Sequence, residues 1–190
     1  GIWVRRQRWP RPYGVRKPKE YGVKEPGDLV QVDTLDVRPL PGVTLKHFTA
    51  RDVVSRWDVV EAHSRATAIT AVHFLGALLE RMPFPVKALQ VDGGSEFQAA
   101  FEEECQKRDI RLFILPPRSP KLNGRVERAH RTHTEEFYQL YDGELEITTL
   151  NRALLAWERT YNTIRPHQAL DWRTPQEYLI QCHPELVPTT

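Results

Sequence analysis

The pattern of hydrophobic and polar residues along this chain predicts alternating strands and helices. Residues 29–37 alternate and are rich in β-branched side chains, which predicts a strand. Two further β-rich runs, 47–55 and 57–64, follow after short interruptions and predict an antiparallel meander of three strands. Between Ala66 and Arg81 apolar residues recur every three or four positions, the period of a helix with one buried face.

The second half of the chain predicts strands that alternate with helices. Residues 86–92 form an apolar run that ends at Asp92, and two glycines then turn the chain into a helix that we expect Ser95 to cap. Residues 110–116 predict the last strand, and further helices are expected near 123–138, 148–165 and 174–179. This order predicts an α/β protein with a five-stranded mixed sheet, its first three strands antiparallel, and helices on both faces.

Composition and charge divide the chain unevenly. Its 190 residues, 40% of them hydrophobic, can bury the core of one domain. Residues 1–25 carry eight Lys or Arg against two Glu, although the whole chain has a net charge of only +2. This segment is either an arm that binds a polyanion, with Arg5, Arg6, Arg8 and Arg11 among its contacts, or a stiff proline-containing linker. We expect a basic arm or linker at 1–27, a catalytic core at 28–182 and a tail at 183–190.

Several classes of protein are disfavoured by what the sequence lacks. It has no run of about 18 apolar residues and no charged-then-apolar start typical of a secretory signal, so we expect no membrane span and a cytoplasmic location. Cys105 and Cys182 lie far apart, which argues against a disulfide framework or a cysteine zinc site. Trp57, Trp157 and Trp172 are expected to be core or interface aromatics.

Three carboxylates occupy positions that predict a metal site. Asp33 lies within an apolar strand, where a buried acid is rare unless it is paired or bound to metal. Asp92 ends its strand at the carboxyl edge of the predicted sheet, and Glu127 lies about four residues into a helix that reaches the same edge. Oxygen-only ligands suit Mg²⁺ or Mn²⁺, and two such ions can promote an in-line phosphoryl displacement. Asp33, Asp92 and Glu127 are therefore the predicted catalytic and metal-binding residues. For Glu96 we favour a solvated first-turn acid over a helper of this site.

Basic residues surround Glu127 at the start of its helix. We expect Arg125, Arg128, His130 and Arg131 to receive the phosphate backbone of DNA. An ordinary ion pair between Glu127 and Arg131, four residues apart, is the competing interpretation. A zinc site at His130 and His133 is a weaker alternative, and His167 is expected to be structural rather than catalytic.

Four motifs together resemble the catalytic core of retroviral-type integrases and of the related insertion-sequence transposases. They are QVDT, QVDGGSEF, SPKLNGRVERAHRTHTEEFY and YNTIRPHQALDWRTPQEYL, and they span most of residues 29–179. The resemblance implies a ribonuclease-H-like fold in which Asp33, Asp92 and Glu127 match the three metal-binding acids. One departure is Gly93, which stands where the family often has Asn after the second acid.

The resemblance also implies an activity and its partners. The expected reaction exposes a 3′ hydroxyl at an element end and then joins it to target DNA, with two Mg²⁺ or Mn²⁺ ions per site. The expected partners are transposon ends, target DNA and further copies of the chain, with an ATPase as an additional candidate, in a bacterial, nucleoid-associated setting. Residues 1–27 are expected to be a linker from an N-terminal DNA-binding module. The alternatives are a nuclease of the same fold that cuts without joining and a non-catalytic DNA-binding relative.

Overall fold

The five strands form the mixed sheet that the sequence predicts. The computed structural model describes residues 15–116 and 124–186, so Arg5, Arg6, Arg8 and Arg11 lie outside the described residues. The first three strands are antiparallel, and the other two run parallel to the first, in the spatial order β3-β2-β1-β4-β5. Their bounds are β1 Val30–Val37, β2 Leu45–Asp52, β3 Asp58–His63, β4 Ala88–Val91 and β5 Arg111–Ile114.

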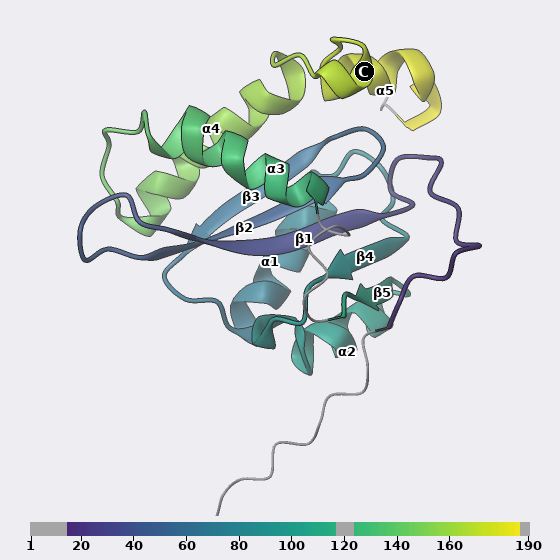
Figure 1. The fold of residues 1–190 in the computed structure, drawn as a ribbon, viewed down its shortest axis with the longest axis horizontal. Helices are drawn as coiled ribbons and strands as arrows, with labels where there is room; N and C mark the ends of the chain where they lie inside the picture. Colours follow the sequence, from purple (N-terminus) through teal and green to yellow (C-terminus); the bar gives the residue numbers. More distant parts are fainter. Residues whose placement is uncertain (1–14, 117–123, 187–190) are drawn as a thin grey trace, which may run out of the picture.

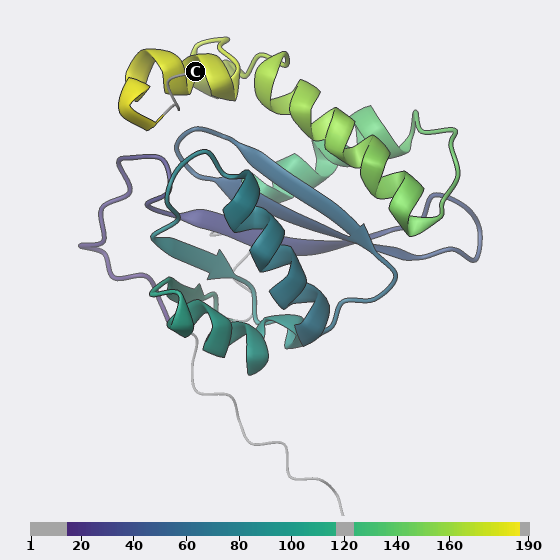
Figure 2. The same cartoon turned by 180° about the vertical axis from the view of Figure 1, so that it is seen from behind.

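Helices cover both faces of this sheet, again as predicted. One pair, α1 (Ala68–Arg81) and α2 (Ala100–Lys107), lies on the face turned away from the viewer in Figure 1 and toward the viewer in Figure 2. The other pair, α3 (Gly124–His133) and α4 (Ile147–Thr163), lies on the opposite face. The last helix, α5 (Pro175–Cys182), begins with the expected proline and a capping box from Thr174.

The two faces of the sheet differ in chemistry. Strand alternation directs Val32 and Phe48 toward α1, into an apolar core cluster. The register pairs Asp33 with Thr49 and Gln31 with Arg51. These four residues alternate with those that face α1, so they lie on the opposite face, toward α3. Near α3 this face therefore carries polar side chains, whereas Val60 and Ala62 pack with Leu150 and Leu154 of α4 in a second apolar cluster.

The region after β4 departs from the sequence prediction. Ser95 does not cap a helix: Ser95–Phe97 is a single 3-10 turn, and α2 begins only at Ala100, without a side-chain cap. The ring of Phe97 is 1% exposed and packs edge-on against Phe48 and Phe101. Burying this ring takes precedence over the local capping preference, and the chain restarts its helix after Ala99, whose φ is 45°.

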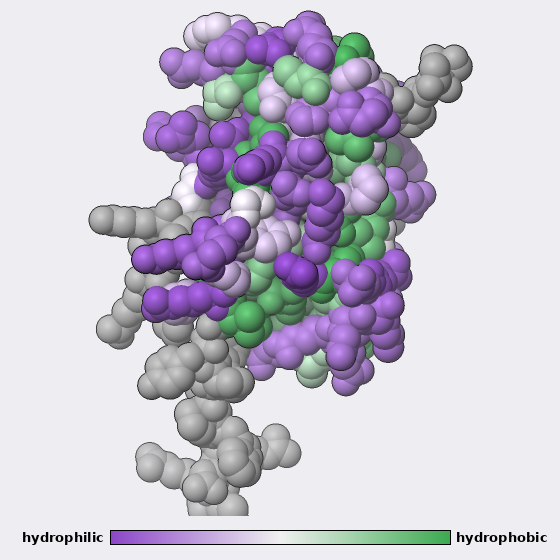
Figure 3. Space-filling view, turned by 90° about the vertical axis from the view of Figure 1, so that its right-hand side faces the viewer, coloured by the Kyte–Doolittle hydropathy of each residue, from purple (hydrophilic) through white to green (hydrophobic). Residues whose placement is uncertain are grey.

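Within residues 15–116 and 124–186, no helix is both long enough and apolar enough to cross a bilayer. The side of the molecule shown in Figure 3 carries mostly hydrophilic side chains in its upper part, with hydrophobic ones in patches between them.

Candidate active site at the carboxyl edge of β1 and β4

Asp33 lies on β1, and Asp92 comes directly after β4, the strand beside it. The parallel register of β1 and β4 pairs Gln31 with Gln90 and ends with Val32 opposite Val91. Asp33 is the next residue of β1, and Asp92 is the first residue beyond β4. Alternation along β1 puts Asp33 on the same face as Gln31, the face that α3 covers. Asp92 lies near enough for its charge to raise the pKa of Asp33.

Glu127 approaches the same place from α3. It is an exposed residue in the first turn of that helix, which packs against β1 and β2. Burial, together with the charges of Asp92, Glu127 and Glu96, raises the pKa of Asp33 to about 7, although a hydrogen bond from the Thr34 amide lowers it. The three predicted acids are therefore close enough to interact electrostatically.

Glu96 joins the cluster as a fourth acid, which the sequence interpretation undervalued. A Cβ added to Gly94 would lie 2.7 Å from Glu96 Oε2 and 2.8 Å from Asp92 Oδ1. The Gly94 amide also donates to Asp92 Oδ1 at 2.8 Å. Glycine at this position lets two carboxylates approach across one turn, and the motif DGGSE is the sequence signal for it.

The donor set fits a hard divalent cation. Four carboxylates and no sulfur lie around this edge, which favours Mg²⁺ or Mn²⁺. The oxygens of Asp33, Asp92 and Glu127 do not all lie within 4.8 Å of one another; Glu61, His63 and His73 are the one such group in the described residues. Repulsion among like charges opposes closer approach, and a bound cation would remove it.

The competing ion pair of Glu127 is not formed. Arg131 Nε donates instead to Glu135 Oε1, one helical turn further on, at 2.8 Å. The interpretation that Glu127 exists to pair with Arg131 is therefore wrong, and its carboxylate is left to the acidic cluster.

The predicted DNA contact at His130 is wrong. Its side chain is 8% exposed and lies beneath α3 near the ring of His47. Burial and the neighbouring His133 lower the pKa of His130 to about 3, so the imidazole is neutral. Val126, Ala129, His130 and His133 recur at helical spacing and form the buried face of α3. This spacing could have predicted from the sequence that His130 is buried. Arg125, Arg128 and Arg131 are exposed and keep their predicted role as a proposal.

His133 does not share a zinc site with His130, because both its ring nitrogens are hydrogen bonded. Its Nε2 lies 3.0 Å from Asp58 Oδ2 and its Nδ1 lies 2.9 Å from His47 Nε2. The Tyr138 hydroxyl lies 2.9 Å from His47 Nδ1 at one end of this chain of hydrogen bonds. At the other end, Arg51 donates twice to Asp58, at 2.7 and 2.6 Å. This buried network joins β2, β3 and α3 behind the acids, and the sequence did not predict it.

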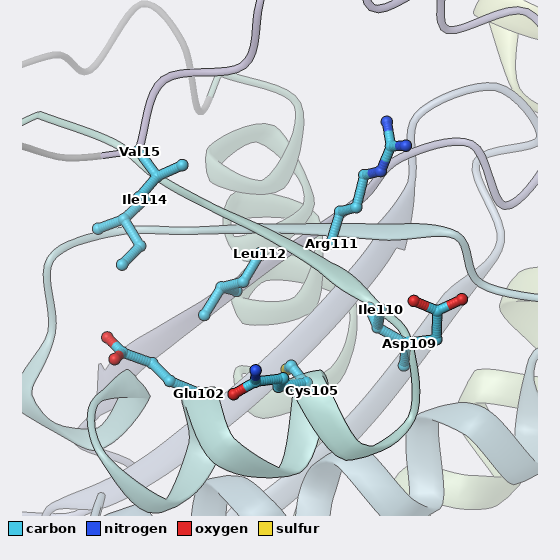
Figure 4. A pocket seen from close by; sticks show the side chains of 9 residues that line it. Val15, Glu102, Cys105, Asp109, Ile110, Arg111, Leu112 and Ile114 are labelled. Atoms are coloured by element: carbon cyan, nitrogen blue, oxygen red, sulfur yellow. The ribbon is translucent and has the colours of Figure 1, made fainter.

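A separate hollow between α2 and β5 is not part of this site. It has a volume of about 370 Å³ and is lined mainly by apolar side chains, among them Val15, Leu112 and Ile114 (Figure 4). Burial raises the pKa of the Cys105 thiol to about 12, so this residue behaves as the small apolar group that the sequence indicates.

Sequence comparisons match an integrase family and proteins of a virus and of an insertion element. The family described as "Integrase core domain" matches residues 108–175. A protein of Spiroplasma virus SpV1-C74 named as an integrase is 27% identical over 107 residues, covering 50% of this chain and 29% of that protein. An uncharacterized 31.7 kDa protein of insertion element IS407 from Burkholderia multivorans is 29% identical over 96 residues, covering 48% and 33%. These alignments span about a third of each curated relative.

Solved structures share the architecture over most of the chain. The catalytic core domain of BIV integrase superposes with a TM-score of 0.64 and 26% identity, covering 83% of this chain and 97% of that one. The HTLV-2 integrase catalytic core domain in complex with magnesium gives a TM-score of 0.63 at 16% identity, covering 80% and 96%. A chain of the simian T-cell lymphotropic virus intasome gives a TM-score of 0.70 at 17% identity, covering 94% and 61%.

Proposed function

We propose that this chain, an integrase/transposase-type catalytic core with a ribonuclease-H-like fold, cleaves DNA strands and transfers them in a metal-dependent reaction. The observation that carries this proposal is the cluster of acids around Asp33, whose pKa rises to about 7. Such a concentration of negative charge at a sheet edge is costly without a cation, and it is what phosphoryl transfer requires.

The proposed reaction has two displacements at phosphorus. In the first, water attacks a phosphodiester at the element end, and the strand that leaves carries a 3′ hydroxyl. In the second, this hydroxyl attacks a phosphodiester of target DNA, so that one bond forms as the bond to the target's 3′ oxygen breaks. Bound divalent ions would activate the attacking oxygen and stabilise the leaving one.

The residues of this chain would divide the work by position. Asp33 and Asp92, fixed on two strands, and Glu127, carried by α3, would hold the cations. Arg125 and Arg128, exposed on α3 beside Glu127, would orient the phosphate backbone. The carboxylates therefore act on the reacting phosphorus through the ions, and the arginines act on the strand that carries it.

We extend the proposal to the rest of the chain. Residues 28–182 would form the catalytic unit, and the basic segment 1–27 would add salt-sensitive DNA contacts through Arg5, Arg6, Arg8 and Arg11. Joining two DNA ends calls for more than one active site, so we propose that the chain self-associates on DNA.

Metal should stabilise the protein more at pH 8 than at pH 5. The pKa of Asp33 is about 7 in the folded chain against 3.8 unfolded, so without metal its contribution to the free energy of unfolding is lost as pH rises from about 4 to 7. Above that range Asp33 is ionised and uncompensated, and Mn²⁺ at a hundred times its Kd should add about 2.7 kcal/mol. The melting temperature, measured with and without Mn²⁺ at both pH values, tests this expectation.

Asp33→Asn provides the control for this titration. The variant should lose both the decline between pH 4 and 7 and most of the response to Mn²⁺, because the titrating group and a metal ligand are removed together. A melting temperature that does not respond to Mn²⁺ in the parent protein at pH 8 would count against the metal site.

A further inference from the structure

A cavity of about 740 Å³ opens beside the acidic cluster. It lies between the start of α3, the turn that joins β2 to β3, and the segment that follows α4. Gln31, two residues before Asp33 on the same face of β1, forms part of its wall, so the cavity adjoins the candidate active site. We call it the arginine pocket, because its lining includes Arg51, Arg56, Arg125, Arg128 and Arg165, together with Trp172.

Two of these arginines have their charge balanced by acids. Arg51 pairs with the buried Asp58 at 2.6 Å, and Arg165 pairs with Glu136 at 2.6 Å. Arg56, Arg125 and Arg128 form no ion pair with any residue in the ranges that the structure describes. The pocket therefore concentrates uncompensated positive charge.

Arg56 shows most clearly that an anion would be favoured there. Its Nε is buried and has no hydrogen-bond partner among the described residues. Burial, and then the charges of Arg125 and Arg51, lower the pKa of the Arg56 guanidinium to about 10. A phosphate between these guanidinium groups would supply both the missing acceptor and the missing negative charge.

Trp172 gives the pocket an apolar edge. Its side chain is 69% exposed, so of the two expectations, a core or an interface aromatic, only the interface remains for this tryptophan within the chain as described. Asp171 and Trp172 both have left-handed backbone conformations, with φ of 54° and 64°. The turn is fixed by hydrogen bonds from the Trp172 amide to the His167 carbonyl at 3.0 Å and from the His167 amide to the Arg173 carbonyl at 2.9 Å. This turn places Trp172 in the pocket lining with its side chain exposed.

We propose that the arginine pocket binds an unpaired nucleotide of a DNA strand. Its phosphate lies among Arg56, Arg125 and Arg128, and its base stacks on Trp172. Positive charge alone would suit any phosphate, but an exposed aromatic ring stacks on a base only where pairing does not enclose that base in a duplex. The inference rests on the proposed function for its substrate class, DNA, and adds a preference for strand ends that are frayed or single-stranded.

Binding of dye-labelled oligonucleotides, measured by fluorescence anisotropy in EDTA, tests the stacking contact without strand cleavage. Trp172→Ala should weaken binding to a single strand, and to a duplex with an unpaired end, by about tenfold. It should change binding to a blunt duplex less than about twofold, and Trp172→Phe should recover most of the loss because it keeps a ring. Ile69→Ala is the matched control, since Ile69 is an exposed apolar residue on α1, 81% accessible.

The phosphate contact has its own signature in the salt dependence. Arg128→Gln, an exposed substitution that should leave folding intact, should lower the slope of log Kd against log salt for single strands by about 0.7. Arg159→Gln removes an exposed charge from α4 outside the pocket lining and should leave the slope unchanged. Equal losses for single strands and blunt duplex in Trp172→Ala, or an unchanged slope in Arg128→Gln, would overturn the proposal.

The outcome is separable from that of the proposed reaction. Glu127→Gln should keep the parent's preference for unpaired ends over blunt duplex, because Glu127 does not line the arginine pocket. Strand joining that survives in that variant would refute the catalytic proposal and leave these binding results standing.

Discussion

Glu127→Gln is expected to reduce the joining of DNA ends in Mg²⁺ by at least about a thousandfold. The substitution keeps the size of the side chain but removes the negative charge that α3 adds to the cluster around Asp33. Because Glu127 is exposed, the variant should fold normally, and its melting temperature without metal should remain close to that of the parent.

The measurement should count nicked and joined products separately. Glu135→Gln is the matched control. It neutralises another exposed acid, eight residues after Glu127, that forms an ion pair with Arg131. Joining near the parent level in Glu127→Gln would contradict the assignment of this acid. A parent protein that nicks without joining would favour a nuclease, and one that binds DNA with neither product would favour a non-catalytic relative.

The two aspartates should lose activity equally but differ in their effect on stability. Asp33→Asn removes a partly buried charge that three other carboxylates oppose, so it should raise the metal-free melting temperature at pH 8. Asp92→Asn removes an exposed charge just beyond β4, one of those that oppose Asp33, and should raise that temperature by less. Comparing the two variants separates the effect of the clustered charges on stability from their role in the reaction.

The sequence predicted those parts of the fold and of the candidate site that depend on short, local patterns. Alternation identified β1 and marked Asp33 as an acid in a buried strand, and the carboxyl-edge rule placed Asp92 beside it. The prediction failed at His130, where the charge of the helix was considered without its three-and-four spacing, and at Ser95, where a capping preference was outweighed by the burial of Phe97.

Features built from distant segments could not be predicted in the same way. The Arg51–Asp58 pair depends on the register between β2 and β3, which the sequence of either strand leaves open. The arginine pocket brings together Arg56 and Trp172, which lie more than half of the chain apart in the sequence. Residues of α3 also line it. Its charge is visible in the sequence only as scattered arginines, because the imbalance arises when folding pairs some of them with acids.

Asp58→Asn is expected to lower the free energy of unfolding by about 3–5 kcal/mol. Asp58 is fully buried and accepts from Arg51 and from His133, so the substitution leaves a buried guanidinium without its counter-charge. Urea denaturation gives the measurement. Asp36→Asn is the control, because Asp36 pairs with Lys46 at the surface and its loss should cost at most about 1 kcal/mol.

The pH dependence of the parent protein should carry the same signature. Burial favours the neutral form of Asp58, but Arg51 and His133 outweigh it and hold the pKa of that carboxyl at about 2, against 3.8 unfolded. Its contribution to stability is therefore present above about pH 4 and is lost as pH falls toward 2, and Asp58→Asn should remove this dependence. A variant that unfolds within about 1 kcal/mol of the parent would show that the network does not hold α3 against β2 and β3. The position of Glu127 beside Asp33 would then need another support.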